Sequence, residues 1–394
     1  MAERLGVLVL NQISAAGLSR LPAERYRVGK DVADPAAILV RSADLHAMTI
    51  APSVRAIGRA GAGTNNIPVA AMSARGVPVF NAPGANANAV KELVLAGMLM
   101  AARHVGPALR FVAALDPARP DFEKAVEDGK KAYAGYELAG QTLGIIGLGK
   151  IGCLVADAAI KLGMQVLGYD PHITVDAAWS LPSQVKRAAS VNDVLRSAQF
   201  VTLHVPLVES TRHLVNDANV GLMRQGAVLL NFSREGVVSE SAVLEALAGE
   251  RLASYVCDFP SPILSAEPRV IALPHLGAST REAEENCAVM VVDQLRDYLE
   301  HGNIANAVNF PTVQMSRESP WRVAIANANV PNMLGQISTT VAKAGLNIHN
   351  MVNKSRGEMA YTLVDVDSAP SDTVIAELAG ITGVLAVRHL PSAG

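Results

Sequence analysis

Two polar residues stand where an α/β enzyme would need them. His275 lies in the segment PHLGAST, directly after the apolar run Val270–Leu273, and Arg234 lies in NFSREG, directly after Ala227–Asn231. Open α/β sheets bind ligands at the carboxyl ends of their strands. An imidazole at that edge can move a proton, and a guanidinium can hold a carboxylate through two parallel hydrogen bonds. On local sequence alone, a structural histidine and a surface arginine are the alternatives.

The segment Gly147-Leu-Gly149-Lys-Ile-Gly152 fits the G-x-G-x-x-G pattern of dinucleotide-binding sites. It follows the apolar run Thr142–Ile146, opens a helical pattern, and is followed by Asp170 at the end of the next strand-like run. Gly147 would make a tight turn, Gly149 would let a pyrophosphate approach the backbone, and Gly152 would let helix and strand pack closely. Asp170 would accept hydrogen bonds from a ribose diol and repel a 2′-phosphate. The pattern therefore favours NAD over NADP, and a glycine-rich turn with a capping aspartate is the alternative.

A second glycine cluster, Gly58-Arg-Ala-Gly61-Ala-Gly63, lacks a following strand and acid. It is interpreted as a tight loop that presents backbone N–H groups to an anion, or as a turn without a ligand.

Short β-branched runs between Gly, Pro and Asn predict the strands of two parallel sheets. The first set is Val7–Leu10, Ala37–Val40, Val54–Ile57 and Val77–Phe80, where Pro78 indicates a strand start or an edge. The second set is Thr142–Ile146, Gln165–Tyr169, Phe200–His204, Ala227–Asn231, Ser254–Val256 and Val270–Leu273. Helices are expected from Ala87 to about Leu109 and from Ser279 to about Glu300, and residues 116–139 are interpreted as a crossover or linker.

The pattern changes after residues 311–320, a polar segment with two prolines that predicts a linker. Strands at Trp321–Ala326, Asn347–Val352, Met359–Val366 and Val384–His389, with helices at Pro331–Ala344 and Asp372–Leu378, follow the βαββαβ order of a ferredoxin-like module.

The composition favours an enzyme with a large core. The 394 residues predict two or three domains, and 50% of them are hydrophobic. A net charge of −2 gives no broad field for nucleic acid or an anionic membrane. The three cysteines follow no metal-ligand or CxxC spacing, which suits a cytoplasmic location. The N-terminal apolar run is too short for a signal peptide, and no stretch of about 20 apolar residues would span a bilayer.

The segments GIIGLGKIG, YDP, HVPL, NFSREG and PHLGAST, in this order and spacing, resemble the D-isomer-specific 2-hydroxyacid dehydrogenase family. The C-terminal module resembles an ACT domain. The resemblance implies two doubly wound parallel-sheet domains, one flavodoxin-like and one Rossmann, and a ferredoxin-like ACT domain. The implied boundaries are a substrate domain of residues 1–90 and 285–310, an NAD domain of residues 91–284, a linker of residues 311–320 and a regulatory ACT domain of residues 321–394.

The resemblance also implies roles for individual residues. Arg234 would bind the substrate carboxylate and polarise the carbonyl, and His275 would exchange the proton on the C2 oxygen. The NAD site would be lined by Gly147, Gly149, Lys150, Ile151, Gly152, Asp170, Val205, Phe232, Ser233, Arg234, Asp258, His275, Gly277 and Ala278. The substrate would be faced by Arg59, Gly61, Ala62 and Asn81.

Asn329 and Asn347 match positions that would bind L-serine as an effector. Side-chain amides both donate and accept hydrogen bonds, which suits an amino acid. The alternative is that the two asparagines only cap a helix and end a turn.

The implied reaction is the reversible, NAD-dependent oxidation of 3-phospho-D-glycerate to 3-phosphohydroxypyruvate, the first step of L-serine biosynthesis, by a homodimer or homotetramer. A reductase of hydroxypyruvate, glyoxylate or 2-oxoglutarate would share every nucleotide motif. A non-catalytic, NAD-sensing binding protein is the alternative from another class.

One segment departs from the family. The family pairs its histidine with a glutamate in a DVFxxEP segment, whereas this chain reads Cys257-Asp-Phe-Pro-Ser-Pro262, with Pro262 near the place of the glutamate. Asp258 and Glu267 are nearby carboxylates, and the partner of His275 is left unassigned. Because a carboxylate partner favours the imidazolium, its absence predicts a pH profile of kcat/KM without a strongly raised basic pKa.

Overall fold

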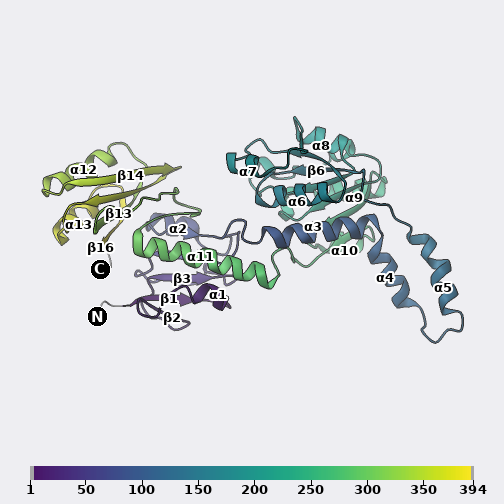
Figure 1. Cartoon of the computed structure of the whole chain (residues 1–394), viewed down its shortest axis with the longest axis horizontal. Coiled ribbons are helices and arrows are strands. Elements are labelled where there is room, and N and C mark those ends of the chain that lie inside the picture. The colour runs from purple at the N-terminus through teal and green to yellow at the C-terminus, as the bar shows by residue number, and fades with distance from the viewer. Residues whose placement is uncertain (1–3, 392–394) are drawn as a thin grey trace. The chain divides into compact units, whose positions relative to one another are not determined.

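The computed structural model describes residues 4–391. Residues 1–3 of the predicted substrate domain and residues 392–394 of the predicted ACT domain lie outside the described residues. The chain divides into two compact units (Figure 1). Unit 1 is Met1–Asn86 with Arg281–Gly394, and unit 2 is Ala87–Thr280. In the described part of the chain, no helix combines the length and the apolar character needed to cross a membrane.

Unit 1 begins with a five-stranded parallel sheet in the order β2-β1-β3-β4-β5, the flavodoxin-like order. Its strands are β1 (Leu5–Val9), β2 (Tyr26–Gly29), β3 (Ala37–Val40), β4 (Ala56–Arg59) and β5 (Val79–Phe80). One face packs against α1 (Ala15–Leu18) and α11 (Arg281–His301), and the other against α2 (Val69–Ala74). The run in which Pro78 indicates an edge or a strand start is the two-residue edge strand β5.

Unit 2 contains a seven-stranded parallel sheet in the order β12-β11-β10-β9-β6-β7-β8, which confirms the predicted Rossmann-type sheet. Its strands are β6 (Thr142–Ile146), β7 (Gln165–Tyr169), β8 (Lys186–Arg187), β9 (Phe200–Leu203), β10 (Ala227–Asn231), β11 (Leu252–Cys257) and β12 (Val270–Ala272). One face packs against α3 (Ala87–Ala102) and α6 (Lys150–Lys161). The other packs against α8 (Val191–Ser197), α9 (Glu240–Ala248) and α10 (Pro262–Ala266), and the short α7 (Val175–Ser180) follows β7.

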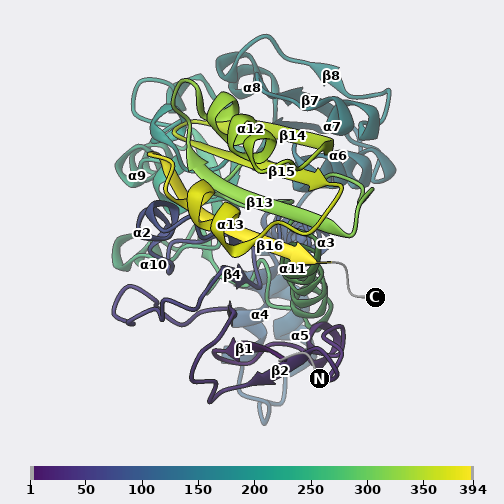
Figure 2. The same cartoon turned by 90° about the vertical axis from the view of Figure 1, so that its left-hand side faces the viewer.

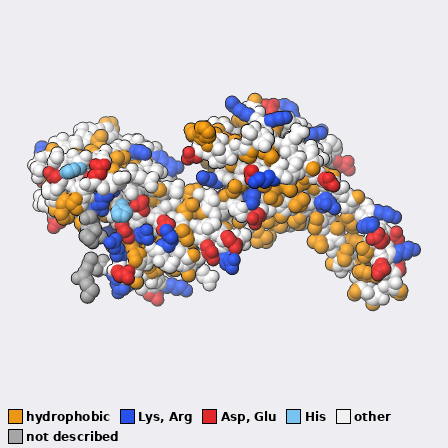
Figure 3. Space-filling model, viewed as in Figure 1, with side chains coloured by type: hydrophobic (Ala, Val, Ile, Leu, Met, Phe, Trp, Pro, Cys, Tyr) orange, Lys and Arg blue, Asp and Glu red, His pale blue; other side chains and the backbone are white. Residues whose placement is uncertain are grey.

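Two helices of unit 2 correct the sequence analysis. The helix expected from Ala87 to about Leu109 breaks at His104, whose φ of 50° is left-handed, and α4 (Val105–Ala114) starts a new helix. Residues 116–139 are not only a linker, because they contain α5 (Phe122–Gly129). Neither of these two described helices has a buried residue, and hydrophobic side chains are visible along them in Figure 3.

The C-terminal part of unit 1 is a four-stranded antiparallel sheet in the order β14-β15-β13-β16. The elements along the chain are β13 (Trp321–Ala328), α12 (Met333–Lys343), β14 (Ile348–Arg356), β15 (Met359–Val366), α13 (Asp372–Ala379) and β16 (Val384–Pro391). This is the ferredoxin-like arrangement that the sequence predicted. Helices α12 and α13 cover one face (Figure 2), and residues of the other face join the core formed with α11.

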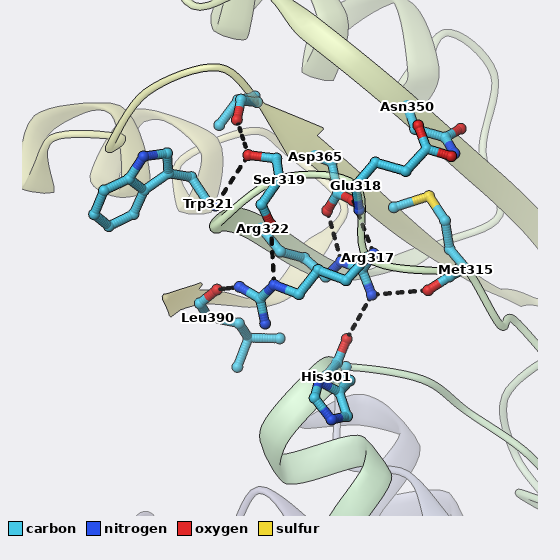
Figure 4. A network of polar contacts seen from close by, with 12 residues as sticks. His301, Met315, Arg317, Glu318, Ser319, Trp321, Arg322, Asn350, Asp365 and Leu390 are labelled. Carbon is cyan, nitrogen blue, oxygen red and sulfur yellow. Dashed lines mark hydrogen bonds and ion pairs between the residues drawn. The ribbon is translucent and has the colours of Figure 1, made fainter. Parts of the chain in front are cut away.

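A buried ion pair lies between this sheet and the end of α11 (Figure 4). Arg322 and Asp365 are both fully buried, and Arg322 Nε and Nη2 donate to the two oxygens of Asp365 at 2.6 and 2.9 Å. The remaining N–H groups of the guanidinium donate to the carbonyl oxygens of His301, Met315 and Ser316, each at 3.0 Å. All five donors of the guanidinium are therefore satisfied.

The last carbonyl groups of α11, and that of Gly302 directly after it, are capped by side chains from the C-terminal segment. The donors and their backbone acceptors are Arg388 to Tyr298 and Leu299, Arg317 to Glu300, Arg322 to His301, and Tyr361 to Gly302. Carbonyls at a helix C-terminus have no partner within the helix, and cations are stabilising at its negative end. These contacts explain why the C-terminal sheet and the five-stranded sheet form one compact unit.

Candidate active site

The glycine-rich turn between β6 and α6 has the shape that the pattern predicts. Gly147 has a φ of 95°, and a Cβ at that position would lie 2.6 Å from the carbonyl oxygen of His204. A Cβ on Gly152 would lie 2.1 Å from the carbonyl oxygen of Gly147, so only glycine allows this packing. A Cβ on Gly149 would meet no heavy atom within 4 Å. Gly149 therefore faces open space at the N-terminus of α6, which has no side-chain cap and offers free N–H groups to a pyrophosphate.

Asp170 closes the same turn from the end of β7. Its two oxygens accept hydrogen bonds from the backbone N–H groups of Leu148 and His172, both at 2.8 Å. Each carboxylate oxygen keeps acceptor capacity, so Asp170 can brace the turn and still accept from a ribose diol. Val205 lies against Gly147, and Lys150 and Ile151 begin α6. The turn region thus gathers seven of the predicted NAD-site residues and fits a dinucleotide.

Arg234 is presented by a tight turn after β10. Asn231, which is fully buried, accepts hydrogen bonds from the N–H and the hydroxyl of Ser233 at 3.1 and 2.8 Å and donates to the carbonyl oxygen of Arg234 at 2.9 Å. Phe232 is buried in the core against α3. The side chains of Phe232 and Ser233 therefore stabilise the fold, and only their backbone can face a ligand.

The sequence analysis missed the role of Asn231, although an amide at the end of a strand is a known turn signal.

The exposed side chain of Arg234 borders an open groove of about 700 Å³ in unit 2. The groove is also lined by Leu207, Arg212, His213, Ser239 and Phe259. Its position follows the carboxyl ends of β10 and β11, which is the ligand-binding edge of an open α/β sheet. A guanidinium at this edge suits an anionic group of a small molecule.

His275 lies three residues beyond β12, at the same edge of the sheet. Its φ of 57° is left-handed, and its ring contacts the ring of Phe259 edge-on, with centroids 5.1 Å apart. Asp258 directly follows β11, is 2% exposed, and accepts hydrogen bonds from the N–H groups of Leu276 and Gly277 at 2.7 Å each. Burial raises the pKa of Asp258, while these two N–H groups and the charge of His275 oppose the rise. Ala278 follows in the same loop and is half-buried.

Neither nearby carboxylate forms an ion pair with His275. Glu267 is engaged by Arg269, whose Nε lies 2.9 Å from Oε1, and this pairing lowers the pKa of Glu267. Asp258 is occupied by the two backbone N–H groups. Among residues 4–391, no carboxylate oxygen lies within 4.0 Å of a ring nitrogen of His275. Pro262 is the first residue of α10 and supplies no acid.

His204 lies directly after β9, where its N–H donates to the carbonyl oxygen of Ile146 at 2.8 Å. Its Nε2 lies 3.0 Å from the hydroxyl of Thr202. Part of the residue reaches solvent, but Nδ1 is enclosed and has no hydrogen-bond partner among the described residues. Burial lowers the pKa of His204 to about 3, so its ring is neutral near pH 7.

The predicted substrate-facing residues lie together in unit 1, at the end of β4 and in the segments directly after β4 and β5. Arg59 Nε donates to the carbonyl oxygen of Arg41, and the amide of Asn81 donates to the carbonyl oxygen of Ala62. The N–H of Gly61 donates to the carbonyl oxygen of Arg59, so that N–H is not open to an anion. A Cβ on Gly61 would overlap the guanidinium of Arg59, so this side chain lies directly against the loop.

Asn329 and Asn347 are not brought together within one chain. Asn329 follows β13, where its side chain donates to the carbonyl oxygen of Gly357 at 3.0 Å. Asn347 precedes β14, where its N–H donates to Asp367 at 3.1 Å. Because β13 and β14 both pair antiparallel to β15, they run in the same direction, and the two asparagines lie at opposite ends of the sheet.

Known proteins resemble this chain along most of its length. The sequence profile described as the NAD-binding domain of D-isomer specific 2-hydroxyacid dehydrogenases matches residues 95–277. A D-3-phosphoglycerate dehydrogenase of Haemophilus influenzae is 32% identical over 353 residues, which are 86% of this chain and 82% of that protein. A protein of the same name from Methanocaldococcus jannaschii is 33% identical over 80% of this chain, and the match spans 58% of that longer relative.

Solved structures share the fold. A crystal structure of a Thermus thermophilus protein covers 77% of this chain and 100% of its own, with a TM-score of 0.63 at 27% identity. The cofactor (NAD+)-bound 3-phosphoglycerate dehydrogenase of Entamoeba histolytica covers 78% of this chain and 99% of its own, with a TM-score of 0.61 at 23% identity. The second likeness concerns the fold alone.

The Rossmann-type sheet, its glycine turn and the polar residues at its carboxyl edge define an NAD-dependent oxidoreductase that acts on a CH–OH group of a small molecule. The chain belongs to the D-isomer-specific 2-hydroxyacid dehydrogenase family.

Proposed function

We propose that this protein is an NAD-dependent dehydrogenase of 3-phospho-D-glycerate, which it converts reversibly to 3-phosphohydroxypyruvate in the first step of L-serine biosynthesis. The observation that carries the proposal is the similarity to the Haemophilus influenzae D-3-phosphoglycerate dehydrogenase over 82% of that protein. The position of Arg234 and His275 at one edge of the sheet in unit 2 supports it.

In this proposal, different residues of unit 2 bind the cofactor, bind the substrate carboxylate and transfer the proton. NAD, when bound, supplies the acceptor for a hydride from C2 of the hydroxy acid. The glycine turn and Asp170 would hold the dinucleotide. Arg234 would bind the substrate carboxylate, and His275 would take the proton from the C2 hydroxyl. In this proposal residues 1–90 and 285–310 bind the substrate, and residues 91–284 bind NAD.

The test is the oxidation of NADH with 3-phosphohydroxypyruvate, compared with hydroxypyruvate, glyoxylate and 2-oxoglutarate. A kcat/KM highest for the phosphorylated acid would support the proposal. A preference for one of the other acids would make the protein a related reductase. NADH binding without turnover of any acid would favour a binding protein.

We further propose that residues 321–394 form an ACT domain and that L-serine binds it. Because Asn329 and Asn347 lie at opposite ends of the sheet, one serine can contact both only if two copies pair, which favours a homodimer or homotetramer. Calorimetry that shows no serine binding, together with an unchanged rate, would contradict this. The three cysteines are unpaired and buried, which supports a cytoplasmic location.

A further inference from the structure

His275 has a backbone conformation that must be held by its surroundings. Its φ of 57° lies in the left-handed region, which residues with a Cβ rarely adopt. Its N–H donates to the carbonyl oxygen of Leu273 at 3.0 Å, which closes a tight turn directly after β12. The direction of the imidazole depends on this turn, because the first bond of the side chain starts from that backbone.

Asp258 locks the turn from the neighbouring strand. Strands β11 and β12 pair in parallel, and the N–H of Leu273 donates to the carbonyl oxygen of Cys257 at 2.8 Å. The carboxylate of the next residue, Asp258, binds the N–H groups of both residues that follow His275. A Cβ on Gly277 would lie only 3.0 Å from Oδ2 of Asp258, so the carboxylate sits tightly against this backbone.

Phe259 restricts the ring itself. The rings of Phe259 and His275 meet at an interplanar angle of 62° with their centroids 5.1 Å apart. This edge contact is a favoured geometry for aromatic pairs. Phe259 directly follows Asp258, so one dipeptide at the end of β11 contacts both the backbone and the ring of the histidine.

We propose that Asp258 and Phe259 are positioning residues that hold His275 in the direction needed for proton transfer, in place of an ion-paired carboxylate. The inference rests on one part of the proposed function, namely that His275 is the group that exchanges the proton. Asp258 acts through the backbone and Phe259 through the ring. Their contribution therefore belongs to kcat, because a misdirected imidazole slows proton transfer without weakening the binding of either substrate.

The central test is Phe259→Ala, with Phe259→Tyr as the conservative variant. Kinetics use whichever 2-oxo acid the unaltered enzyme reduces fastest with NADH, so the result does not depend on the identity of the substrate. We expect Phe259→Ala to lower kcat by about 10-fold to 100-fold with KM for NADH within about 3-fold, and Phe259→Tyr to restore most of the rate. Ile263→Ala, an exposed residue of the nearby α10, is the matched control and should keep the wild-type rate.

A second background separates positioning from a general loss of structure. In His275→Ala, the added Phe259→Ala change should leave the residual rate unaltered, because there is no imidazole left to position. If this change lowers the residual rate of His275→Ala by the factor seen in the wild type, the inference is wrong. It is also wrong if Phe259→Ala keeps the wild-type kcat.

If the protein reduces none of the acids, the proposed function is contradicted, but the positioning role of Phe259 can still be tested by a measurement that needs no turnover. Diethyl pyrocarbonate modifies exposed imidazoles, and mass spectrometry of peptides measures its rate at His275. We expect this rate to rise several-fold in Phe259→Ala and to stay unchanged in Ile263→Ala. An equal rate in the wild type and Phe259→Ala would overturn the role of Phe259.

Discussion

Replacing Asp365 by asparagine should destabilise unit 1 far more than the loss of an ordinary ion pair. The substitution keeps the size of the side chain and removes its charge. Arg322, which is fully buried, would then lack an anion, and the N–H of Glu318 would lose its charged acceptor at 3.0 Å. Removing one partner of a buried ion pair costs about 3–5 kcal/mol of folding free energy.

Removing both charges should not restore stability. Buried ion pairs can often be replaced by apolar residues at little cost. In Arg322→Met with Asp365→Leu, however, the carbonyl oxygens of His301, Met315 and Ser316 would lose their shared donor. Of these three residues only Met315 is buried, and leaving its carbonyl oxygen unsatisfied costs about 1–3 kcal/mol, so the double variant should also be less stable than the wild type.

The assay is urea denaturation followed by tryptophan fluorescence. The chain has two tryptophans, and Trp179 is 86% exposed, so a Trp179→Phe background leaves Trp321, beside the ion pair, as the reporter. The matched control in the same unit is Asp293→Asn, which removes an exposed pair with Arg20 and should change the unfolding free energy by about 0.5 kcal/mol or less. If Asp365→Asn shifts the midpoint no more than Asp293→Asn does, the reasoning is refuted.

Three further predictions concern unit 2. Gly149→Ala should keep the melting temperature but raise the Kd of NADH at least about 10-fold, whereas Gly152→Ala should lower the melting temperature, because only the second Cβ overlaps backbone. Arg234→Ala should lower kcat/KM about 10-fold to 100-fold, consistent with a lost charge-assisted contact, and a near wild-type value would remove Arg234 from the site. Since burial lowers the pKa of His204 to about 3, the unfolded state takes up the proton first as the pH falls below about 6.5. The stability of unit 2 should then fall by about 1.4 kcal/mol per pH unit between pH 6 and pH 4, and His204→Gln should remove that part of the slope.

Apolar periodicity predicted the central strands well. The segments Ala37–Val40, Thr142–Ile146, Gln165–Tyr169 and Ala227–Asn231 match β3, β6, β7 and β10 in both bounds. These strands lie inside parallel sheets with helices on both faces, so their sequences are nearly continuous apolar runs. Both missed strands, β2 and β8, lie at sheet edges, where polar residues such as Lys186 and Arg187 interrupt the pattern.

The contacts around the candidate site could not be predicted in the same way. Spacing placed His275 and Arg234 after the correct strands, because strand ends are local features. It could not assign the hydrogen bonds of Asp258 or Glu267, since the partner of a carboxylate depends on which strand ends lie side by side. The same holds for Arg322 and Asp365, which are separated by 43 residues and meet only when β13 pairs with β15.

The capped end of α11 has a mechanical consequence. Four side chains from the C-terminal segment grip one end of a 21-residue helix, which is about 30 Å long. The other end of that helix begins at Arg281, six residues after His275 in the chain. Helix α11 therefore links the C-terminal sheet to the segment of the chain that follows His275. Because α11 also packs against the five-stranded sheet, both sheets and residue 281 belong to one compact unit, which meets the chain of unit 2 six residues after His275.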